Sequence, residues 1–572
     1  MMKRIFYCAL LLLLMMNCKK KSITEPDPVD PVDPVDPVVP GVDPPTANTI
    51  GFFLDNWSTR NFTKPSFQEV PLTTAAVTAT VTIDAGEIIT KIPQSVFGQN
   101  SNSWMTQMVT ETSLMNHLKN LKPGEIRFPG GSISDVYFWN AARPDKPATA
   151  PEGHLNAEGN IVADPYWYGR NNDSWTISVD NYYNLLTQTG SQGMITVNYG
   201  FARYGTSDDP VATAAHLAAD WVRYDNGRTR YWEIGNETNG TWEAGYRIDP
   251  ALNKDGQPAI ITGELYGRHV QVFVDSMKKA ASEIGKTIYI SAYLLEKQPA
   301  GWQTPTDQGW NAGVLTASNN KADYYTIHSY YTNYQTNASA AEILNTATAV
   351  TTDMMAFTKS EFVKSGAVTK PVALTEWNIT SQGSMQQVSF VNGMHASILL
   401  AESIKNKYGQ TSRWDLANGW ADGNDHGLFD MGDEPGGVKW NPRPAFYYMY
   451  YMGLFTGDRL LKTTVTGELL AYGSSFTSGE TAAMIANKST AVKTASVVLK
   501  NISKRKRIYW YVLTGGTDNG DFSRKVLVNG KGPTLVSGGP SDYKTIQAYS
   551  ALVDQDLKID LPPRSVVYLV LE

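Results

Sequence analysis

Cysteine is almost absent from this chain of 572 residues, because Cys8 and Cys18 are the only two and both lie near the start. The rest of the sequence therefore excludes disulfides and thiolate zinc sites. The seven histidines are scattered singly, with neither an H-E-x-x-H motif nor a pair at metal-ligand spacing. No block of Lys and Arg marks a nucleic-acid surface, and the net charge is -6. No nucleotide motif appears either. We therefore expect no cofactor, no bound metal and no nucleic-acid partner.

The composition is otherwise that of a globular protein rich in aromatic residues. The hydrophobic fraction is 42% and the charged fraction 18%, with 15 Trp, 30 Tyr and 18 Phe. A sugar-binding cleft would use such aromatic faces, but a large core and sandwich surfaces would explain them equally well. A single core rarely grows past about 250–300 residues. The length therefore predicts one large domain and at least one smaller one.

The N-terminus has the pattern of a bacterial lipoprotein signal peptide over residues 1–18. Lys3 and Arg4 precede an apolar stretch, residues 5–16, that is too short for an ordinary transmembrane helix. The sequence LMMNC, which ends at Cys18, is similar to a lipobox, in which the cysteine carries the lipid. We expect a secreted lipoprotein of the bacterial cell envelope, held at the outer membrane on its periplasmic or surface face only by this anchor. The alternative is a plain signal peptide with an incidental cysteine.

Residues 19–49 form a Pro/Asp-rich segment in which proline recurs every third residue. Such a repeat favours extended polyproline II and prevents a packed core, so we interpret it as a semi-rigid tether.

Periodicity divides the remainder into three parts. Residues 50–92 contain strands that we expect to pack on a C-terminal sandwich, because residues 75–92 alternate apolar and polar residues. Residues 93–457 alternate short apolar runs with amphipathic helices, which predicts an α/β fold of the (β/α)8 TIM barrel type. Residues 458–572 have short Val/Thr/Tyr-rich runs separated by turns, which predicts an all-β sandwich. The expected barrel strands are residues 95–98, 125–128, 193–198, 230–235, 287–292, 324–328, 372–375 and a segment near 418–429; expected helices include 210–224, 264–284, 340–364 and 387–407.

Two glutamates stand at the ends of predicted barrel strands, where such enzymes place their catalytic groups. The fourth strand ends in WEIGNE at Glu237, and the seventh in LTEWN, which contains Glu376, 139 residues later. Glycoside hydrolysis needs a pair of carboxyl groups that face each other across the bond. The alternative is two solvated or salt-bridged glutamates. Glu233, also on the fourth strand, is expected to be a structural partner of Arg127 or Arg230.

The motifs of the barrel resemble clan A glycoside hydrolases, and most closely glycoside hydrolase family 51, the α-L-arabinofuranosidases. The resemblance runs from about residue 81 to residue 455. It rests on TID and IPQSVFGQ (82–84 and 92–99), IRFPGG (126–131), RYWEIGNE (230–237), DYYTIHSYY (323–331) and TEWN (375–378).

The resemblance implies a retaining mechanism with Glu376 as nucleophile and Glu237 as acid/base. Asn236 would bind a sugar hydroxyl next to the anomeric carbon, and Tyr330 or Tyr331 would donate a hydrogen bond to Glu376. Arg127 would lie under Glu376 and keep it ionised. For Arg127 a barrel-core salt bridge remains the alternative, and for His328 a satisfied strand histidine. The further substrate-binding candidates are His328, Trp377 and Asn198.

The chain departs from the family at two positions that touch the sugar. Asn102 stands where the family usually has a glutamate, and Ser132 where it usually has an asparagine. Both departures put arabinofuranose specificity in doubt. Near the eighth strand, Trp420 is expected to form the floor under the sugar. Other tryptophans of the presumed mouth loops suit a long cleft, although each alone is more often a packing residue: Trp139, Trp167, Trp175, Trp242 and Trp302.

The sequence therefore predicts a retaining glycoside hydrolase acting on a plant or algal polysaccharide or its oligosaccharides, similar to α-L-arabinofuranosidases. An endo-β-glycanase of the glucanase or xylanase type is the alternative. A non-catalytic glycan-binding protein on a relic barrel is a third reading, but a relic would be expected to have lost one of the two glutamates.

Overall fold

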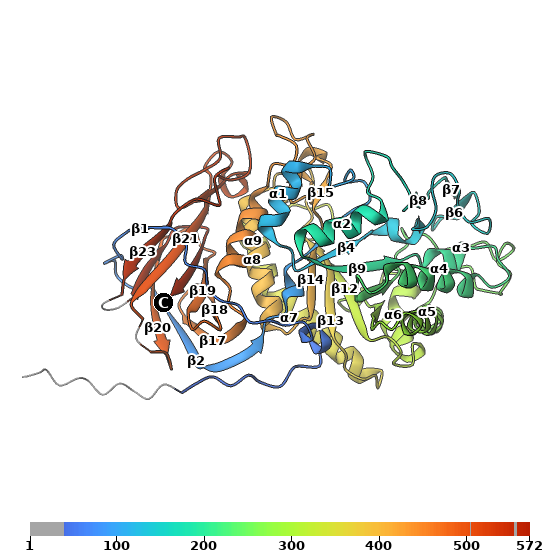
Figure 1. Ribbon diagram of the computed structural model, residues 1–572, viewed down its shortest axis with the longest axis horizontal. Coiled ribbons are helices and arrows are strands. Elements are labelled where there is room, and N and C mark those ends of the chain that lie inside the picture. Colours follow the sequence, from blue (N-terminus) through green and yellow to red (C-terminus); the bar gives the residue numbers. More distant parts are fainter. Residues whose placement is uncertain (1–38, 504, 554–556) are drawn as a thin grey trace, which may run out of the picture. The chain divides into compact units, whose positions relative to one another are not determined.

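The computed structural model describes residues 39–503, 505–553 and 557–572 (Figure 1). The expected signal peptide with Cys18 and most of the expected tether lie outside these residues. Residues 39–572 form one compact unit. Within the described residues, no helix is both long and apolar enough to cross a membrane.

Eight parallel strands close into a barrel, as the sequence predicted. Around the barrel the order is β10-β11-β12-β13-β14-β3-β4-β9. The nucleophile strand and the acid/base strand are thus separated by two strands on one side and by four on the other. The strands are β3 (Gly98–Asn100), β4 (Glu125–Phe128), β9 (Gln192–Val197), β10 (Tyr231–Ile234), β11 (Tyr289–Tyr293), β12 (Tyr324–Tyr330), β13 (Val372–Asn378) and β14 (Gln410–Arg413).

The helices of the barrel begin at side chains that cap them. Ser339 and Glu342 form a capping box at the start of α7, and Thr304 with Asp307 does the same for α6. Asp209 caps α4, where Pro210 takes the first helical position. The helices are α1 (Thr112–Leu121), α2 (Val179–Thr189), α3 (Gly200–Tyr204), α4 (Pro210–Asp225), α5 (Gly263–Glu283), α6 (Pro305–Ala317), α7 (Ala340–Lys364), α8 (Phe390–Lys405) and α9 (Pro444–Phe455).

Two barrel strands differ from the expected positions. The first is β3, and the residues expected to form it lie mostly in the 3-10 turn η2 (Gln94–Phe97). The eighth is β14, upstream of the segment near 418–429, which instead forms the short strands β15 (Ala417–Asn418) and β16 (Phe429–Asp430) outside the barrel. The sequence of β14 is polar, yet it is buried because its hydroxyls bond internally. Ser412 donates to Glu125 at 2.6 Å and Thr411 to the carbonyl of Val96 at 2.7 Å.

The remaining strands form one 11-stranded sheet that includes a strand from the N-terminal part. Strand β2 pairs with β17 and runs parallel to β20. Both ends of the sheet contribute to one apolar core, so the sheet folds back on itself as a sandwich. Its strands are β1 (Phe67–Glu69), β2 (Ala79–Lys91), β17 (Arg459–Thr466), β18 (Leu470–Ser475), β19 (Thr481–Asn487), β20 (Lys493–Lys500), β21 (Arg507–Gly515), β22 (Val526–Val528), β23 (Ala548–Leu552), β24 (Leu557–Leu561) and β25 (Ser565–Leu571).

Strand β25 joins the sandwich to the barrel through the two-residue period of a strand. Val567, Leu569 and Leu571 point into the sandwich core, while the residues between them pack against the core of the barrel part. The hydroxyl of Tyr568 donates to the carbonyl of Tyr448 in α9 at 2.9 Å. Helices α8 and α9 therefore lie between the sheet and the barrel strands (Figure 1).

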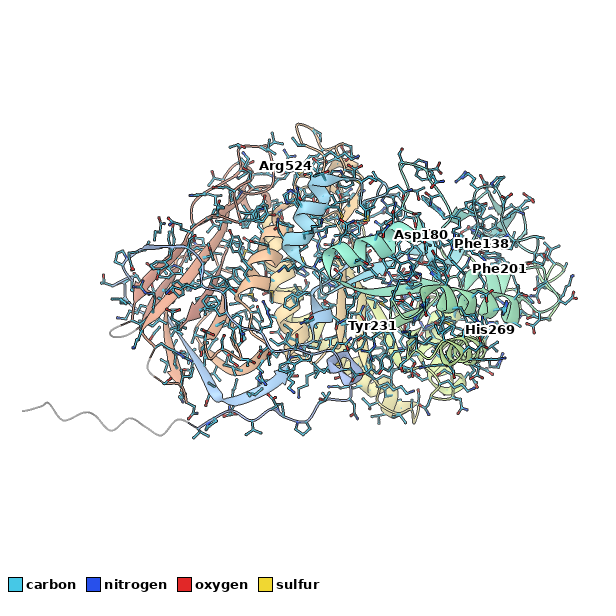
Figure 2. The ribbon with its side chains drawn as sticks, in the orientation of Figure 1. Phe138, Asp180, Phe201, Tyr231, His269 and Arg524 are labelled. Atoms are coloured by element: carbon cyan, nitrogen blue, oxygen red, sulfur yellow. The ribbon has the colours of Figure 1, made fainter. Side chains whose placement is uncertain are left out.

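The floor of the barrel is closed by the short helix η1 (Gly51–Leu54). Phe52 stacks on Tyr289 with ring centroids 3.6 Å apart, and Phe53 stacks on Tyr231, which Figure 2 labels, at 4.8 Å. The amide of Val372 donates to the carbonyl of Thr49 at 3.0 Å. These contacts cover the N-terminal ends of the strands. The opposite, C-terminal ends of the strands carry the loops that surround the candidate site.

Candidate active site

Glu237 and Glu376 meet at the C-terminal mouth of the barrel. Glu376 lies within β13, and Glu237 follows β10 by three residues. A carboxylate oxygen of each and a ring nitrogen of His328 all lie within 4.8 Å of one another. Retaining glycosidases hold their carboxyl groups about 5–5.5 Å apart, whereas inverting enzymes need about 6.5–9.5 Å. The spacing of the pair therefore fits direct attack by one carboxylate.

Arg127 is the buried hub beneath this pair. Its guanidinium donates to Glu233 at 2.6 Å, and to Glu376 at 3.3 Å. It also donates to the side-chain oxygens of Asn100 and Asn236, both at 2.9 Å. The two acidic partners outweigh the effect of burial and raise the pKa of Arg127. A positive charge thus lies under the site, but it does not offset the burial of Glu376, whose pKa is raised.

Glu233 is the structural partner of Arg127 rather than of Arg230. It is fully buried and also accepts hydrogen bonds from Thr196 at 2.8 Å and Thr375 at 3.0 Å. Burial alone would raise its pKa, but the charge of Arg127 outweighs burial and lowers it. Glu233 therefore remains a carboxylate that holds the arginine in place.

His328 connects the two candidate catalytic carboxyls. Its Nδ1 lies 2.9 Å from Glu237 Oε1 and 3.8 Å from Glu376 Oε2, while Nε2 is hydrogen-bonded to Thr375 at 3.1 Å. Burial would lower the pKa of His328, but the surrounding carboxylates outweigh it and raise the pKa to about 9. At neutral pH the imidazole therefore carries a proton beside Glu237.

The protonated imidazole affects the pKa of Glu237. Burial opposes ionisation of Glu237, but the hydrogen bond from His328 outweighs burial and lowers its pKa. The indole of Trp242 also donates to Glu237, at 3.1 Å. For Glu376 burial dominates and raises the pKa, assisted by repulsion from Glu237. A general acid usually has a raised pKa. Glu237 instead shares the proton of His328 across a 2.9 Å hydrogen bond.

Successive side chains of a strand point to opposite sides, and this separates the two tyrosines that could donate to Glu376. Tyr330 donates to Glu376 Oε1 at 2.6 Å. Tyr331 points to the other side and forms a 2.8 Å hydrogen bond with Thr351 in α7. Only the first can tune the carboxylate.

Two acidic residues beside Asn236 were not among the sequence candidates. The amide nitrogen of the Asn236 side chain donates to Glu243 at 2.8 Å, and Ser132 donates to the same oxygen of Glu243 at 2.8 Å. Asp135 accepts the backbone amide of Asn236 at 3.1 Å. Burial raises the pKa of Glu243 and raises that of Asp135 to about 7. Glu243 follows Glu237 by only six residues, but no sequence pattern distinguishes such a buried acid from a surface one.

At Asn102, where the chain departs from the family, a buried carboxyl group lies beside the amide. The side chain of Asn102 donates to Asp415, which directly follows Trp414. Burial raises the pKa of Asp415 well above its usual range. Trp414, at the end of β14, lies against Gly130 and Gly131, where an added Cβ would come within 3.3 Å and 2.5 Å of its ring. Trp414 thus occupies the position near the site that was expected for Trp420.

Three candidate binding residues are placed elsewhere. Trp420 is held between Arg443 and Arg524, each 5.4 Å from its ring, because the eighth strand ends before this loop. Trp377 is fully buried in the core. Asn198 accepts the amide of Phe201 at 2.9 Å and donates to neighbouring oxygens, so it fixes the start of α3.

In the part of the chain that the structure describes, one group of three potential metal ligands is close enough together to hold an ion: Glu237, His328 and Glu376. The Glu237–His328 hydrogen bond and the Tyr330–Glu376 hydrogen bond already account for this arrangement. The expectation of no cofactor stays a prediction.

Comparison with known proteins places this fold among glycoside hydrolases. No protein-family model matches the chain. An intracellular exo-α-(1→5)-L-arabinofuranosidase of Bifidobacterium longum is 24% identical over 243 residues, which are 41% of this chain and 36% of that protein. The chain spans between about a third and a half of the length of the curated relatives it matches.

Solved structures agree over a larger share of the chain. The family 51 α-L-arabinofuranosidase from Thermotoga petrophila is 15% identical with a TM-score of 0.59, covering 86% of this chain and 100% of that one. A family 44 endoglucanase from Clostridium thermocellum is 12% identical with a TM-score of 0.55, covering 87% of this chain and 100% of that one. The (β/α)8 barrel fold expected from the sequence is confirmed.

Proposed function

We propose that the protein is a retaining glycoside hydrolase with Glu376 as nucleophile and Glu237 as acid/base. The observation that carries the proposal is the approach of Glu237, His328 and Glu376 to within 4.8 Å at the barrel mouth. The likeness in fold to arabinofuranosidases and endoglucanases supports it. A chance pair of solvated glutamates would not share a buried histidine, as Glu237 and Glu376 share His328.

The reaction follows from the contacts of these groups. Glu376 attacks the anomeric carbon while the Glu237–His328 pair protonates the departing oxygen, which forms a glycosyl-enzyme. Glu237 then takes a proton from water, which attacks the same carbon and releases Glu376. Arg127 and Tyr330 stabilise the carboxylate before attack and after release. Asn236, oriented by Arg127 and Glu243, presents its amide to a neighbouring sugar hydroxyl, a contact that strengthens as positive charge develops.

Two substrates deserve a direct comparison. The matched curated proteins are named exo-α-(1→5)-L-arabinofuranosidases, which favours α-L-arabinofuranosides. Asn102 and Ser132 replace the family residues that grip this sugar, and one neighbour in fold is an endoglucanase, which favours a β-glycan. We expect weak or no cleavage of aryl α-L-arabinofuranosides relative to a β-glucan, xylan or xyloglucan. Efficient turnover of the arabinofuranoside alone would restore the first substrate.

Substitution of each glutamate tests the mechanism. Glu376→Ala removes the nucleophile, so activity should be lost except with a small added anion. Glu237→Ala removes proton transfer, a step that contributes about 10²–10⁴-fold. A substrate whose leaving group needs no proton should still glycosylate Glu376 in this variant, and azide should rescue turnover with retained configuration.

The exposed Glu264→Ala variant is the control and should behave as the unaltered protein. Swapped behaviour of the two variants would reverse the two roles. Full activity in either variant would remove the hydrolase proposal.

We also propose that Cys18 carries a lipid that holds the protein at the bacterial outer membrane. The motif at residues 14–18 and the proline repeat after it support this proposal. Cys18→Ala should move the protein from the membrane fraction to the soluble fraction. A variant that still sediments with membranes through a detergent-free wash would show that the lipobox interpretation is wrong.

A further inference from the structure

Four tryptophans form a continuous row that starts at the active site. Neighbouring ring centroids are 6.4 Å apart for Trp414 and Trp104, 6.5 Å for Trp104 and Trp167, and 5.6 Å for Trp167 and Trp175. Trp414 is only 8% exposed, whereas Trp175 is 47% exposed. The row therefore leads from a buried inner end to solvent.

The inner end of the row belongs to the catalytic centre. The amide of Trp414 donates to the carbonyl of Trp377, the residue after Glu376, at 3.0 Å. The side-chain oxygens Asn102 Oδ1 and Asp415 Oδ1, next to Trp414, are buried and have no hydrogen-bond partner among the described residues. Asn102 and Asp415 are both fully buried, so these two oxygens shape the inner end of the row and are out of reach of a sugar hydroxyl.

The outer end of the row is a shallow hollow with mixed lining. It is formed by Trp167, Trp175 and Tyr168 together with polar side chains, Arg143, Asn171 and Asp173. The hollow is too small to enclose a sugar ring, so a sugar unit would stack on the exposed ring of Trp175 beside these polar groups.

The loops with the inner two tryptophans lie across the mouth from the acid/base, since β14 is four strands from β10 and β3 is three, whereas β4 is two strands away. Trp414 follows β14, Trp104 follows β3, and the last two tryptophans lie between β4 and β9, whereas Glu237 follows β10. Glu237 protonates the leaving group, so the leaving group lies on its side of the site. The tryptophan row then lies on the other side of the cleaved bond, which is the side of the sugar whose anomeric carbon Glu376 attacks.

We propose that Trp104, Trp167 and Trp175, which continue outward from Trp414 at the site, form subsites for further sugar units on the non-reducing side of the cleaved bond, so that the enzyme cuts inside a polysaccharide chain. This inference rests on the proposed function. An exo-acting enzyme would need the site closed beyond the attacked sugar. The row instead continues from the site to the surface, where Trp175 is 47% exposed.

The test uses 4-nitrophenyl β-glycosides that carry one to four glucose or xylose units on the same leaving group. In the unaltered protein kcat/KM should rise with the number of units. Trp175→Ala should lower kcat/KM about 5- to 10-fold for the longest compounds, as expected for loss of one stacking ring, and leave the one-unit compound unchanged. Trp175→Phe should retain part of the increase because it keeps an aromatic face.

Trp302→Ala is the matched control, because Trp302 is 86% exposed and follows β11, outside the row. It should not change the dependence on glycone length. With a polymeric substrate, Trp175→Ala should give a smaller drop in viscosity for each reducing end that is released. A length-independent kcat/KM in the unaltered protein, or an equal loss on every compound, would overturn the inference.

Binding separates failure of this inference from failure of the proposed function. The migration of the Glu376→Ala variant should be slowed in gels that contain β-glucan or xylan. Adding the Trp175→Ala change should abolish this retardation. If the intact protein hydrolyses nothing but Trp175 still controls retardation, the proposed function fails and the row remains as a glycan-binding surface. If hydrolysis proceeds and Trp175 has no effect in either assay, the row is overturned alone.

Discussion

Tyr330→Phe is the most sensitive test of the charge balance at the nucleophile. The change removes one hydroxyl, which donates to Glu376 Oε1 at 2.6 Å, and keeps the ring. A hydrogen bond to a charged group contributes about 1.5–3 kcal/mol. Because about 1.4 kcal/mol corresponds to a tenfold change in rate, kcat/KM should fall about 10- to 150-fold.

The pH dependence should change in a defined direction. Burial already raises the pKa of Glu376, and the bond from Tyr330 is one of the interactions that lower it. Without that bond the carboxyl holds its proton to higher pH. The proposed attack by Glu376 requires its ionised form, so the acidic limb of the kcat/KM profile should move to higher pH in Tyr330→Phe.

Tyr331→Phe supplies the matched control, because its hydroxyl contacts Thr351 in α7 rather than the site. This variant should keep the rate and the pH profile and lose only about 0.5–1.5 kcal/mol of unfolding free energy. Profiles of kcat/KM against pH and chemical denaturation curves measure both quantities. If Tyr330→Phe were as active as the unaltered protein, or if only Tyr331→Phe shifted the acidic limb, the assigned hydrogen bond would be irrelevant to catalysis.

Three further predictions follow from the same site. In His328→Asn the basic limb should move from near pH 9 to lower pH, because the pKa of His328 is raised to about 9 and Glu237 alone must then hold the proton; a limb that stays in place would show that His328 does not share it. Glu243→Ala should lower kcat/KM about 2- to 10-fold by freeing the amide of Asn236, and a combined change with Asn236→Ala should add nothing further; additive losses would separate the two residues. Activity should survive EDTA, since carboxylate-pair chemistry needs no metal; complete loss that calcium reverses would reveal a structural ion.

The sequence was most informative where the chain follows a regular period. The helix predicted over residues 340–364 has those bounds in the structure, because Ser339 and Glu342 mark its start. The polar strand β14 was misplaced, because Gln410, Thr411 and Ser412 are buried through hydrogen bonds and not through apolar surface. Hydrophobic periodicity cannot detect such a strand.

In the site, too, residues that belong to a local sequence motif could be predicted, whereas residues defined by tertiary contacts could not. Glu237 and Glu376 could be named because each ends a recognisable strand. Trp414 was missed in favour of Trp420, because its assignment depends on where β14 ends. Glu243 and Asp415 become functional candidates only through contacts with Ser132, Asn236 and Asn102, which no spacing along the chain encodes.

The placement of β2 and of η1 has a consequence for the order of folding. The floor helix η1 contacts Tyr231, Tyr324 and Pro371, which are synthesised about two to three hundred residues later. Strand β2 must wait longer, since both of its neighbours, β17 and β20, lie near the C-terminus. The earliest part of this chain therefore cannot complete its pairing until the end of the chain has emerged. A protein shortened from the C-terminus would leave β2 with open edges that favour aggregation over independent folding of the barrel.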